Sequence, residues 1–244
     1  MIFTNSPLVT YTKITNNKTK NRNHAIDTIT IHCIVGQWTA KQGCDYFATT
    51  NRKCSANYVV GKDGSIGLSV DEKDRSWCSS NAANDHRAIT IEVASDTEHP
   101  YAVTDKAYNA LIQLIADICK RNNIKELKWK ADPSLIGQVD KQNMTVHKWF
   151  AKKDCPGEYL YSRHSDIAAK VNAILNVKPA KMEIKVGSTV RLKKGAKTFQ
   201  GGNLASFVYE RDHQVKEINI DRVVITYNKI VVAAVRKSDL TVIN

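Results

Sequence analysis

A short stretch of the chain, TVHKWFAKKDCPGEYL, brings three chemically active side chains together: His147, Lys153 and Cys155. Imidazole nitrogen and cysteine thiolate are zinc ligands, and a catalytic zinc keeps three protein ligands and one position open to water. His147 and Cys155 are eight residues apart, too far for one helical face, so they favour a loop that folds back towards a sheet. Because Pro156 suits the first turn of a helix, we expect the positive helix end to lower the pKa of Cys155. The stretch therefore predicts two zinc ligands on a loop.

The third ligand must come from another part of the chain. Residues 27–35, DTITIHCIV, alternate as a strand does and place His32 on the more polar face. Residues 88–95, AITIEVAS, repeat the pattern with Glu92 on the polar face. A lone strand histidine is more often structural, but together with the two ligands above His32 is the best candidate for the third.

The strand and helix patterns of residues 1–176 predict an α/β domain, a mixed β-sheet flanked by helices, that positions these residues. Residues 57–70 predict a hairpin that turns at Asp63-Gly64. Residues 104–123 predict an amphipathic helix capped at Thr104 or Asp105, and residues 165–175 predict a second helix with Ser165 as its N-cap. Helices packed on such a sheet define the fold class.

The last third of the chain has a different pattern. Residues 177–186 are polar and contain Pro179, as a linker would. Residues 187–244 then carry short β-rich runs such as SFVYE and RVVITY without a helical pattern, which predicts a small all-β barrel. This part holds no cluster of chemically active residues, so we interpret it as a binding module.

Composition limits the classes of partner. The net charge of +12 predicts an acidic partner, either nucleic acid or an anionic surface such as a cell wall, unless the lysines serve only solubility. The absence of an arginine-rich tract, an RNA-binding signature or zinc-finger spacing disfavours nucleic acid. No apolar run approaches the ~18 residues of a membrane helix, and residues 1–20 lack the pattern of a secretory signal. Six scattered cysteines favour reduced thiols. We therefore expect a protein made in the cytoplasm.

Four stretches together resemble the type 2 N-acetylmuramoyl-L-alanine amidases, the family of the peptidoglycan recognition proteins and many phage endolysins. They are IDTITIHCIVG, SANYVVGKDGSIG, DHRAITIEVAS and MTVHKWFAKKDCPGEYLY, within roughly residues 20–175. The resemblance implies that His32, His147 and Cys155 bind one zinc ion per chain. It also implies that the substrate is bacterial peptidoglycan, cut at the amide between the lactyl group of muramic acid and the first L-alanine of the stem.

The resemblance further assigns three catalytic residues. Tyr58 matches the tyrosine of the family's site and would donate a hydrogen bond or orient the water. Lys153 matches the catalytic lysine and would stabilise the oxyanion. Glu92 falls where several members carry an active-site glutamate and would act as general base.

The ending RVVITYNKIVVAAVRKSDLTVI resembles a bacterial Src-homology-3-like domain, of the kind that anchors lytic enzymes to the cell wall. With no signal peptide, this architecture favours a phage or prophage endolysin that a holin releases to the wall. A bacterial autolysin and a non-catalytic peptidoglycan receptor on the same fold are the alternatives. The sequence does not determine the host, the wall chemotype or the oligomeric state.

Overall fold

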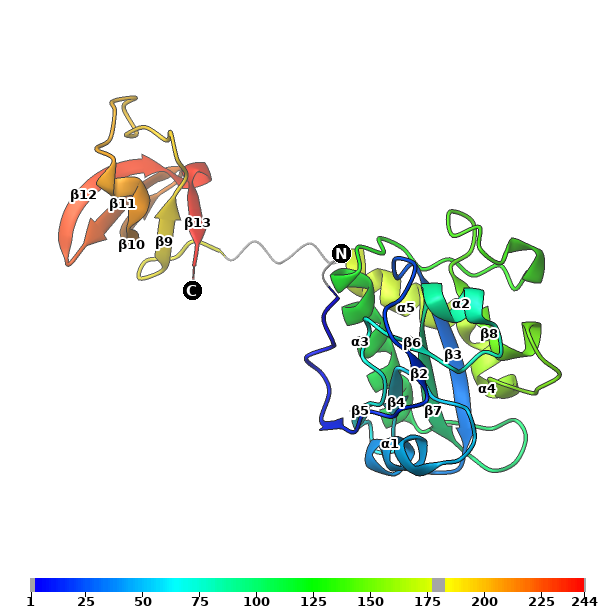
Figure 1. Ribbon diagram of the computed structural model, residues 1–244. Helices are drawn as coiled ribbons and strands as arrows, with labels where there is room; N and C mark the ends of the chain where they lie inside the picture. Colours follow the sequence, from blue (N-terminus) through cyan, green and yellow to red (C-terminus); the bar gives the residue numbers. More distant parts are fainter. Residues whose placement is uncertain (1–2, 177–182, 244) are drawn as a thin grey trace. The chain divides into compact units, whose positions relative to one another are not determined.

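Strand β3 (Thr28–Val35) lies between two parallel neighbours, β7 (Ala88–Ser95) and β8 (Met144–Val146). The computed structural model describes residues 3–176 and 183–243, and within them these strands belong to a six-stranded mixed sheet in the order β1-β5-β4-β7-β3-β8 (Figure 1). The other strands of this sheet are β1 (Tyr11–Thr12), β4 (Tyr58–Val60) and β5 (Ile66–Leu68). A separate ribbon pairs β2 (Lys18–Thr19) with β6 (Arg75–Ser76). The sheet belongs to the first of two units, Met1–Val177 and Lys178–Asn244.

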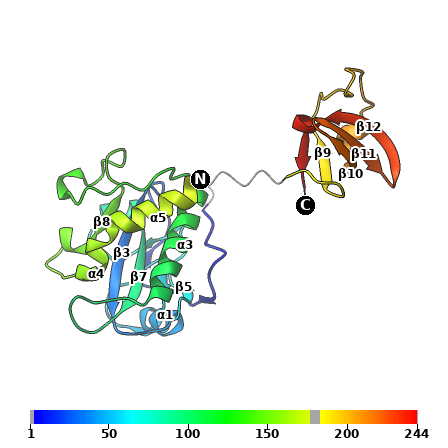
Figure 2. The ribbon, with the colours of Figure 1, turned by 180° about the vertical axis from the view of Figure 1, so that it is seen from behind.

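One face of the sheet is apolar because alternate residues of its central strands are isoleucine and valine. Ile29, Ile31, Ile89 and Ile91 are fully buried there, and burying each such side chain contributes roughly 1.5–3 kcal/mol. Helices α3 (Asp105–Arg121) and α5 (His164–Asn176) cover this face, as Figure 2 shows. The opposite face carries the polar residues of the strands.

The predicted elements of this unit are largely confirmed. The hairpin joins β4 to β5, and α3 begins after Thr104, whose hydroxyl accepts a hydrogen bond from the Ala107 amide at 3.1 Å. The prediction of Ser165 as an N-cap is wrong, since α5 already begins at His164, directly behind α4 (Gly157–Ser162).

Two further helices, α1 (Ala40–Thr49) and α2 (Ala82–Arg87), lie on the polar face of the sheet. Helix α1, which the sequence analysis did not predict, begins with a capping box between Thr39 and Gln42 and packs Phe47 near Val59. Helix α2 precedes β7. The 3₁₀ segments of this unit are Pro133–Leu135 and His147–Trp149.

The second unit is mainly β-structure. Within residues 183–243 it forms a five-stranded antiparallel sheet in the order β12-β11-β10-β9-β13. Its elements are β9 (Thr189–Leu192), α6 (Phe207–Glu210), β10 (Asp212–Asn219), β11 (Arg222–Tyr227), β12 (Ile230–Arg236), a 3₁₀ segment (Lys237–Asp239) and β13 (Leu240–Val242). The strand predicted at SFVYE is wrong: Val208 is buried from a short helix instead. Residues 177–182 of the predicted linker lie outside the described residues. Among the helices that the structure describes, none combines the length and hydropathy that spanning a membrane requires.

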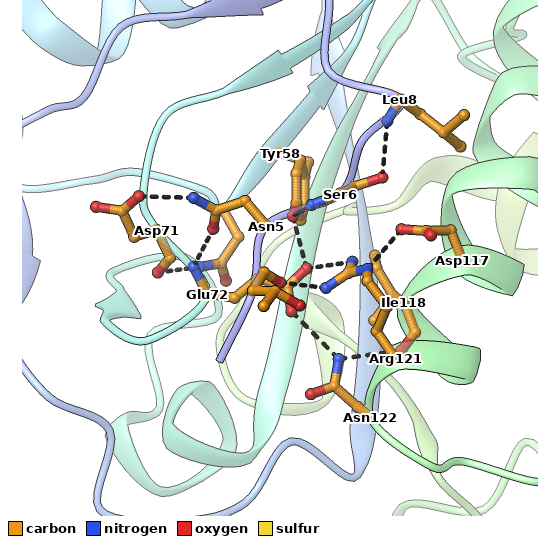
Figure 3. A network of polar contacts seen from close by, with 12 residues as sticks. Asn5, Ser6, Leu8, Tyr58, Asp71, Glu72, Asp117, Ile118, Arg121 and Asn122 are labelled. Atoms are coloured by element: carbon orange, nitrogen blue, oxygen red, sulfur yellow. Dashed lines mark hydrogen bonds and ion pairs between the residues drawn. The ribbon is translucent and has the colours of Figure 1, made fainter. Parts of the chain in front are cut away.

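A buried carboxylate joins the hairpin region to α3 and to the N-terminal segment (Figure 3). Glu72 is fully buried and accepts hydrogen bonds at 2.6 Å from both the Tyr58 hydroxyl and the Arg121 guanidinium. Asn122 donates to its second oxygen at 3.2 Å, while the Ser6 amide donates to the Tyr58 hydroxyl at 2.9 Å. Each polar group of this cluster therefore has a partner, which a buried charge requires.

We expect Arg121→Ala to destabilise the first unit by about 3 kcal/mol, because it leaves the Glu72 carboxylate buried without its counter-ion. Chemical denaturation followed by circular dichroism measures the change. The matched control is Lys41→Ala, which removes a mostly exposed partner of Asp45 and should leave stability nearly unchanged. Equal stabilities of the two variants would contradict the assigned role of this ion pair.

Candidate metal centre and active site

The hydrogen-bond register of three strands sets the position of the candidate site. His32 on β3 is paired directly with Glu92 on β7, so both side chains lie on the same face. On the other side of β3, Ile31 pairs with Val146, the last residue of β8. His147, the next residue, therefore comes beside His32, and residues far apart in the sequence meet in one row.

Cys155 completes a His–His–Cys cluster, defined here as His32, His147 and Cys155. The Sγ atom of Cys155 is 3.4 Å from Nδ1 of His32, and the two imidazole centroids are 5.1 Å apart. One ligand atom from each of the three residues lies within 4.8 Å of the others. The loop between them closes through a backbone hydrogen bond from the Lys148 amide to the Cys155 carbonyl at 3.0 Å, so the predicted return of this loop to the sheet is confirmed.

The donor set of this cluster fits a zinc ion. Two imidazoles and a thiolate form a three-ligand set that leaves a position open. His32 is fully buried, and its Nε2 atom has no hydrogen-bond partner among the described residues. Burial, and then the neighbouring His147, lower the pKa of His32. The imidazole is therefore neutral, the protonation state that binds metal.

The expectation for the pKa of Cys155 is wrong. A hydrogen bond with the Cys33 side chain, together with burial, raises the pKa of the Cys155 thiol well above its usual value. Helix α4 has only six residues, and its end does not outweigh these two effects. The protein alone therefore does not favour the Cys155 thiolate, whereas a divalent cation at the cluster would.

Lys153 and Ser80 both act on His147. Lys153 is exposed, and its positive charge adds to the effect of burial in lowering the pKa of His147. The Ser80 hydroxyl lies 3.0 Å from Nε2 of His147. The catalytic role of Lys153 stays a prediction.

Glu92 faces a cleft of about 310 Å³ next to the cluster. Burial raises the pKa of Glu92 to about 7, and a hydrogen bond from the Cys78 thiol at 3.8 Å partly offsets this effect. A carboxyl group with a pKa near neutrality suits proton transfer at physiological pH. The other residues that line the cleft include His147, Trp38, Tyr46, Arg52 and Trp77.

The sequence analysis missed most of this cleft wall. Trp77 and Cys78, in the segment between β6 and α2, also line it. Tyr46 lies on α1 and Arg52 follows it, so recognising the amphipathic pattern of residues 40–49 was the signal that would have found them.

The structure does not bring Tyr58 to this site, and its assignment as a catalytic hydrogen-bond donor is wrong. In β4, Val59 is paired with Glu92 while Tyr58 is paired with Ile91, so the tyrosine points to the apolar face. Tyr58 is fully buried there, and burial and the Glu72 carboxylate raise the pKa of its hydroxyl. Because side chains alternate along a strand, residues next to each other in β4 face opposite sides of the sheet. Tyr58 therefore stabilises the core, whereas its neighbour Val59 faces the side of Glu92.

Comparison with known proteins agrees with this geometry. The sequence profile of the N-acetylmuramoyl-L-alanine amidase family (Amidase_2) matches residues 22–158, and the chain belongs to that family. His32, Glu92, His147 and Cys155 all fall within that match. A comparison with curated protein sequences gave no match.

Solved structures share the fold of the first unit. PlyL superposes with a TM-score of 0.50 at 17% identity, covering 66% of this chain and 95% of its own. The amidase LysC from Clostridium intestinale URNW has a TM-score of 0.46 at 16% identity, covering 71% of this chain and 100% of its own. A derivative of AmpD has a TM-score of 0.48 at 18% identity, covering 69% and 99%. At this identity the similarity to PlyL shows the fold alone.

We expect Tyr58→Phe to lower the free energy of unfolding of the first unit by on the order of 1–2 kcal/mol, because Glu72 and the Ser6 amide lose a buried hydrogen-bond partner. The turnover of the folded variant should equal that of the wild type. Tyr108→Phe, which removes a partly buried hydrogen bond to Asp166, is the control. A Tyr58→Phe protein that is stable but inactive would show that Tyr58 is a catalytic residue after all.

Proposed function

We propose that this protein is a zinc-dependent N-acetylmuramoyl-L-alanine amidase that hydrolyses the bond between the lactyl group of muramic acid and the first L-alanine of the peptidoglycan stem. The observation that carries the proposal is the His–His–Cys cluster beside a cleft that contains Glu92. Membership of the amidase family supports it.

The three residues of the His–His–Cys cluster would hold the metal. Zinc bound there would supply Lewis-acid chemistry for the hydrolysis of the amide. The two imidazoles and the Cys155 side chain come from β3, from the end of β8 and from the returning loop. Metal binding would therefore depend on the same strand register as the fold.

Glu92 and Lys153 have two different proposed roles, proton transfer and stabilisation of the oxyanion. Hydrolysis of an amide needs a group that removes a proton from water and delivers it to the leaving amine. We propose Glu92 for this proton transfer because it lines the cleft and has a pKa of about 7. The tetrahedral oxyanion needs positive charge, and the exposed Lys153 supplies it near His147. Both roles are proposals for this chain's own residues.

For the second unit we propose a Src-homology-3-like module that binds the cell wall. Its support is the five-stranded antiparallel sheet and an exposed group in which the Arg211 guanidinium lies 5.2 Å from the Phe207 ring and 4.8 Å from the Tyr227 ring. We propose an endolysin, released to the wall by a holin, as the biological setting.

We expect Cys155→Ser to lose bound zinc and all amidase activity, since the cluster then has only two strong ligands. Zinc content per chain and release of free N-terminal alanine from peptidoglycan are the two measurements. Cys54→Ser, which changes another thiol of the cleft, should keep both. A zinc-loaded wild-type protein that binds peptidoglycan but releases no alanine would instead identify a non-catalytic receptor.

Lys153→Ala should retain zinc but lower kcat on the order of 10²-fold, because the oxyanion loses its positive charge. Lys152→Ala changes the adjacent exposed lysine and serves as the matched control with unchanged kcat. Steady-state alanine release at saturating substrate gives both values. Equal losses in the two variants would indicate a general effect of charge rather than a specific role.

Glu92→Gln should lower kcat by at least ~10²-fold, because the carboxamide side chain of glutamine cannot take up a proton from water. Its zinc content, measured by atomic absorption, should stay at the wild-type level. Glu98→Gln, at an exposed position in the loop after β7, should behave as the wild type. An active Glu92→Gln enzyme would exclude Glu92 as the general base.

A further inference from the structure

Two groups of metal-binding side chains share His32. Besides the His–His–Cys cluster, the ligand atoms of His32, Cys78 and Glu92 also lie within 4.8 Å of one another. We name this second group the Cys78 cluster. Glu92 lies on β7, on the opposite side of β3 from His147, which follows β8. Cys78 lies in the segment between β6 and α2. His32 therefore stands between two sets of ligands.

Two buried atoms in the Cys78 cluster point to a ligand. Glu92 Oε1 accepts a hydrogen bond from the Cys78 thiol at 3.8 Å, but Glu92 Oε2 is buried and has no partner among the residues that the structure describes. Nε2 of the fully buried His32 is in the same situation. Buried polar atoms nearly always have a partner, and a bound ion is one explanation for those that do not.

The position of Cys78 is fixed independently of any ligand. Asp85, which is 1% exposed, accepts hydrogen bonds from the Cys78 amide at 3.0 Å and from the Ser79 amide at 3.1 Å. The Asp85 carbonyl in turn accepts from the buried Arg22 side chain at 2.6 Å. The loop thus holds the Cys78 thiol next to Glu92, which gives the cluster the preorganisation that a metal site needs.

We propose that the Cys78 cluster is a second site for a thiophilic divalent cation, such as Zn²⁺ or Cd²⁺, and that a cation bound there inhibits the protein. A thiolate and a carboxylate together neutralise the charge of the ion, and the Cys78 thiol releases its proton to solvent on binding. A neutral imidazole has one nitrogen free to act as ligand, so the two sites compete for His32. The cation also occupies Glu92. The inference goes beyond the proposed amidase activity, and its binding test does not depend on that activity.

Cadmium titration of the full-length protein tests the site, because a Cd²⁺–thiolate bond gives an ultraviolet charge-transfer absorption. Cys155→Ser removes the thiolate of the His–His–Cys cluster, and we expect it still to show this absorption. The absorption should vanish in Cys155→Ser/Cys78→Ser and persist in the matched control Cys155→Ser/Cys54→Ser. Its absence from Cys155→Ser, or its persistence without Cys78, would overturn the proposal.

A comparison that leaves Cys155 in place covers the case in which its variants do not fold. The cadmium–thiolate absorption at saturation should be smaller in Cys78→Ser than in the wild type, and an equal absorption overturns the site. Excess Zn²⁺ should inhibit alanine release by the wild type but not by Cys78→Ser, and equal inhibition overturns the inhibitory role. Absence of alanine release at every zinc concentration would count against the amidase proposal alone, since the cadmium absorption still decides the site.

Discussion

The hydrogen-bond register that β3 shares with β7 and β8 is the constraint on which the site depends. Pairing of His32 with Glu92, and of Ile31 with Val146, brings an imidazole, a carboxyl group and a second imidazole into one row. Because side chains alternate along a strand, a shift of one residue would turn His32 into the apolar core and leave the metal cluster without its central ligand. The same register buries the isoleucines of these strands under α3, so core formation and site assembly select one arrangement.

The two faces of the sheet perform separate tasks, and each face has its own buried polar cluster. On the apolar side, Glu72 joins Tyr58, Arg121 and the N-terminal segment in a fully paired network (Figure 3). On the polar side, His32 and Glu92 keep buried atoms that no described residue satisfies. The Glu72 network is thus paired within the protein, whereas His32 and Glu92 each keep an unpaired buried atom, as do a few side chains away from the candidate site, among them His164 and His213.

On the polar face of the sheet, burial favours the neutral forms of the ionisable side chains. Burial lowers the pKa of His32 and raises the pKa of Glu92 to about 7, while Cys33 and burial raise the pKa of Cys155. A divalent cation reverses this balance, because its charge stabilises a thiolate that the protein alone does not. Burial is thus the physical reason why a cation would favour the thiolate at the proposed zinc site, and the proposed competition between two ligand groups for His32 follows from the crowding of thiols and a carboxyl around one imidazole.

The sequence by itself determined the strands and helices whose apolar periodicity is strong, and it identified the three residues that the fold brings together as the His–His–Cys cluster. The alternation around His32 and Glu92 identified their face, and the spacing of His147 and Cys155 required a returning loop. Tyr58 and α6 were mispredicted, because short apolar runs do not show which neighbour a strand pairs with or whether a helix replaces it. Cys78, Ser80, Arg52 and the cleft wall were decided only by the tertiary structure. They come from loops and from α1, whose positions depend on long-range contacts such as those of Arg22 and Asp85 with the rest of the fold.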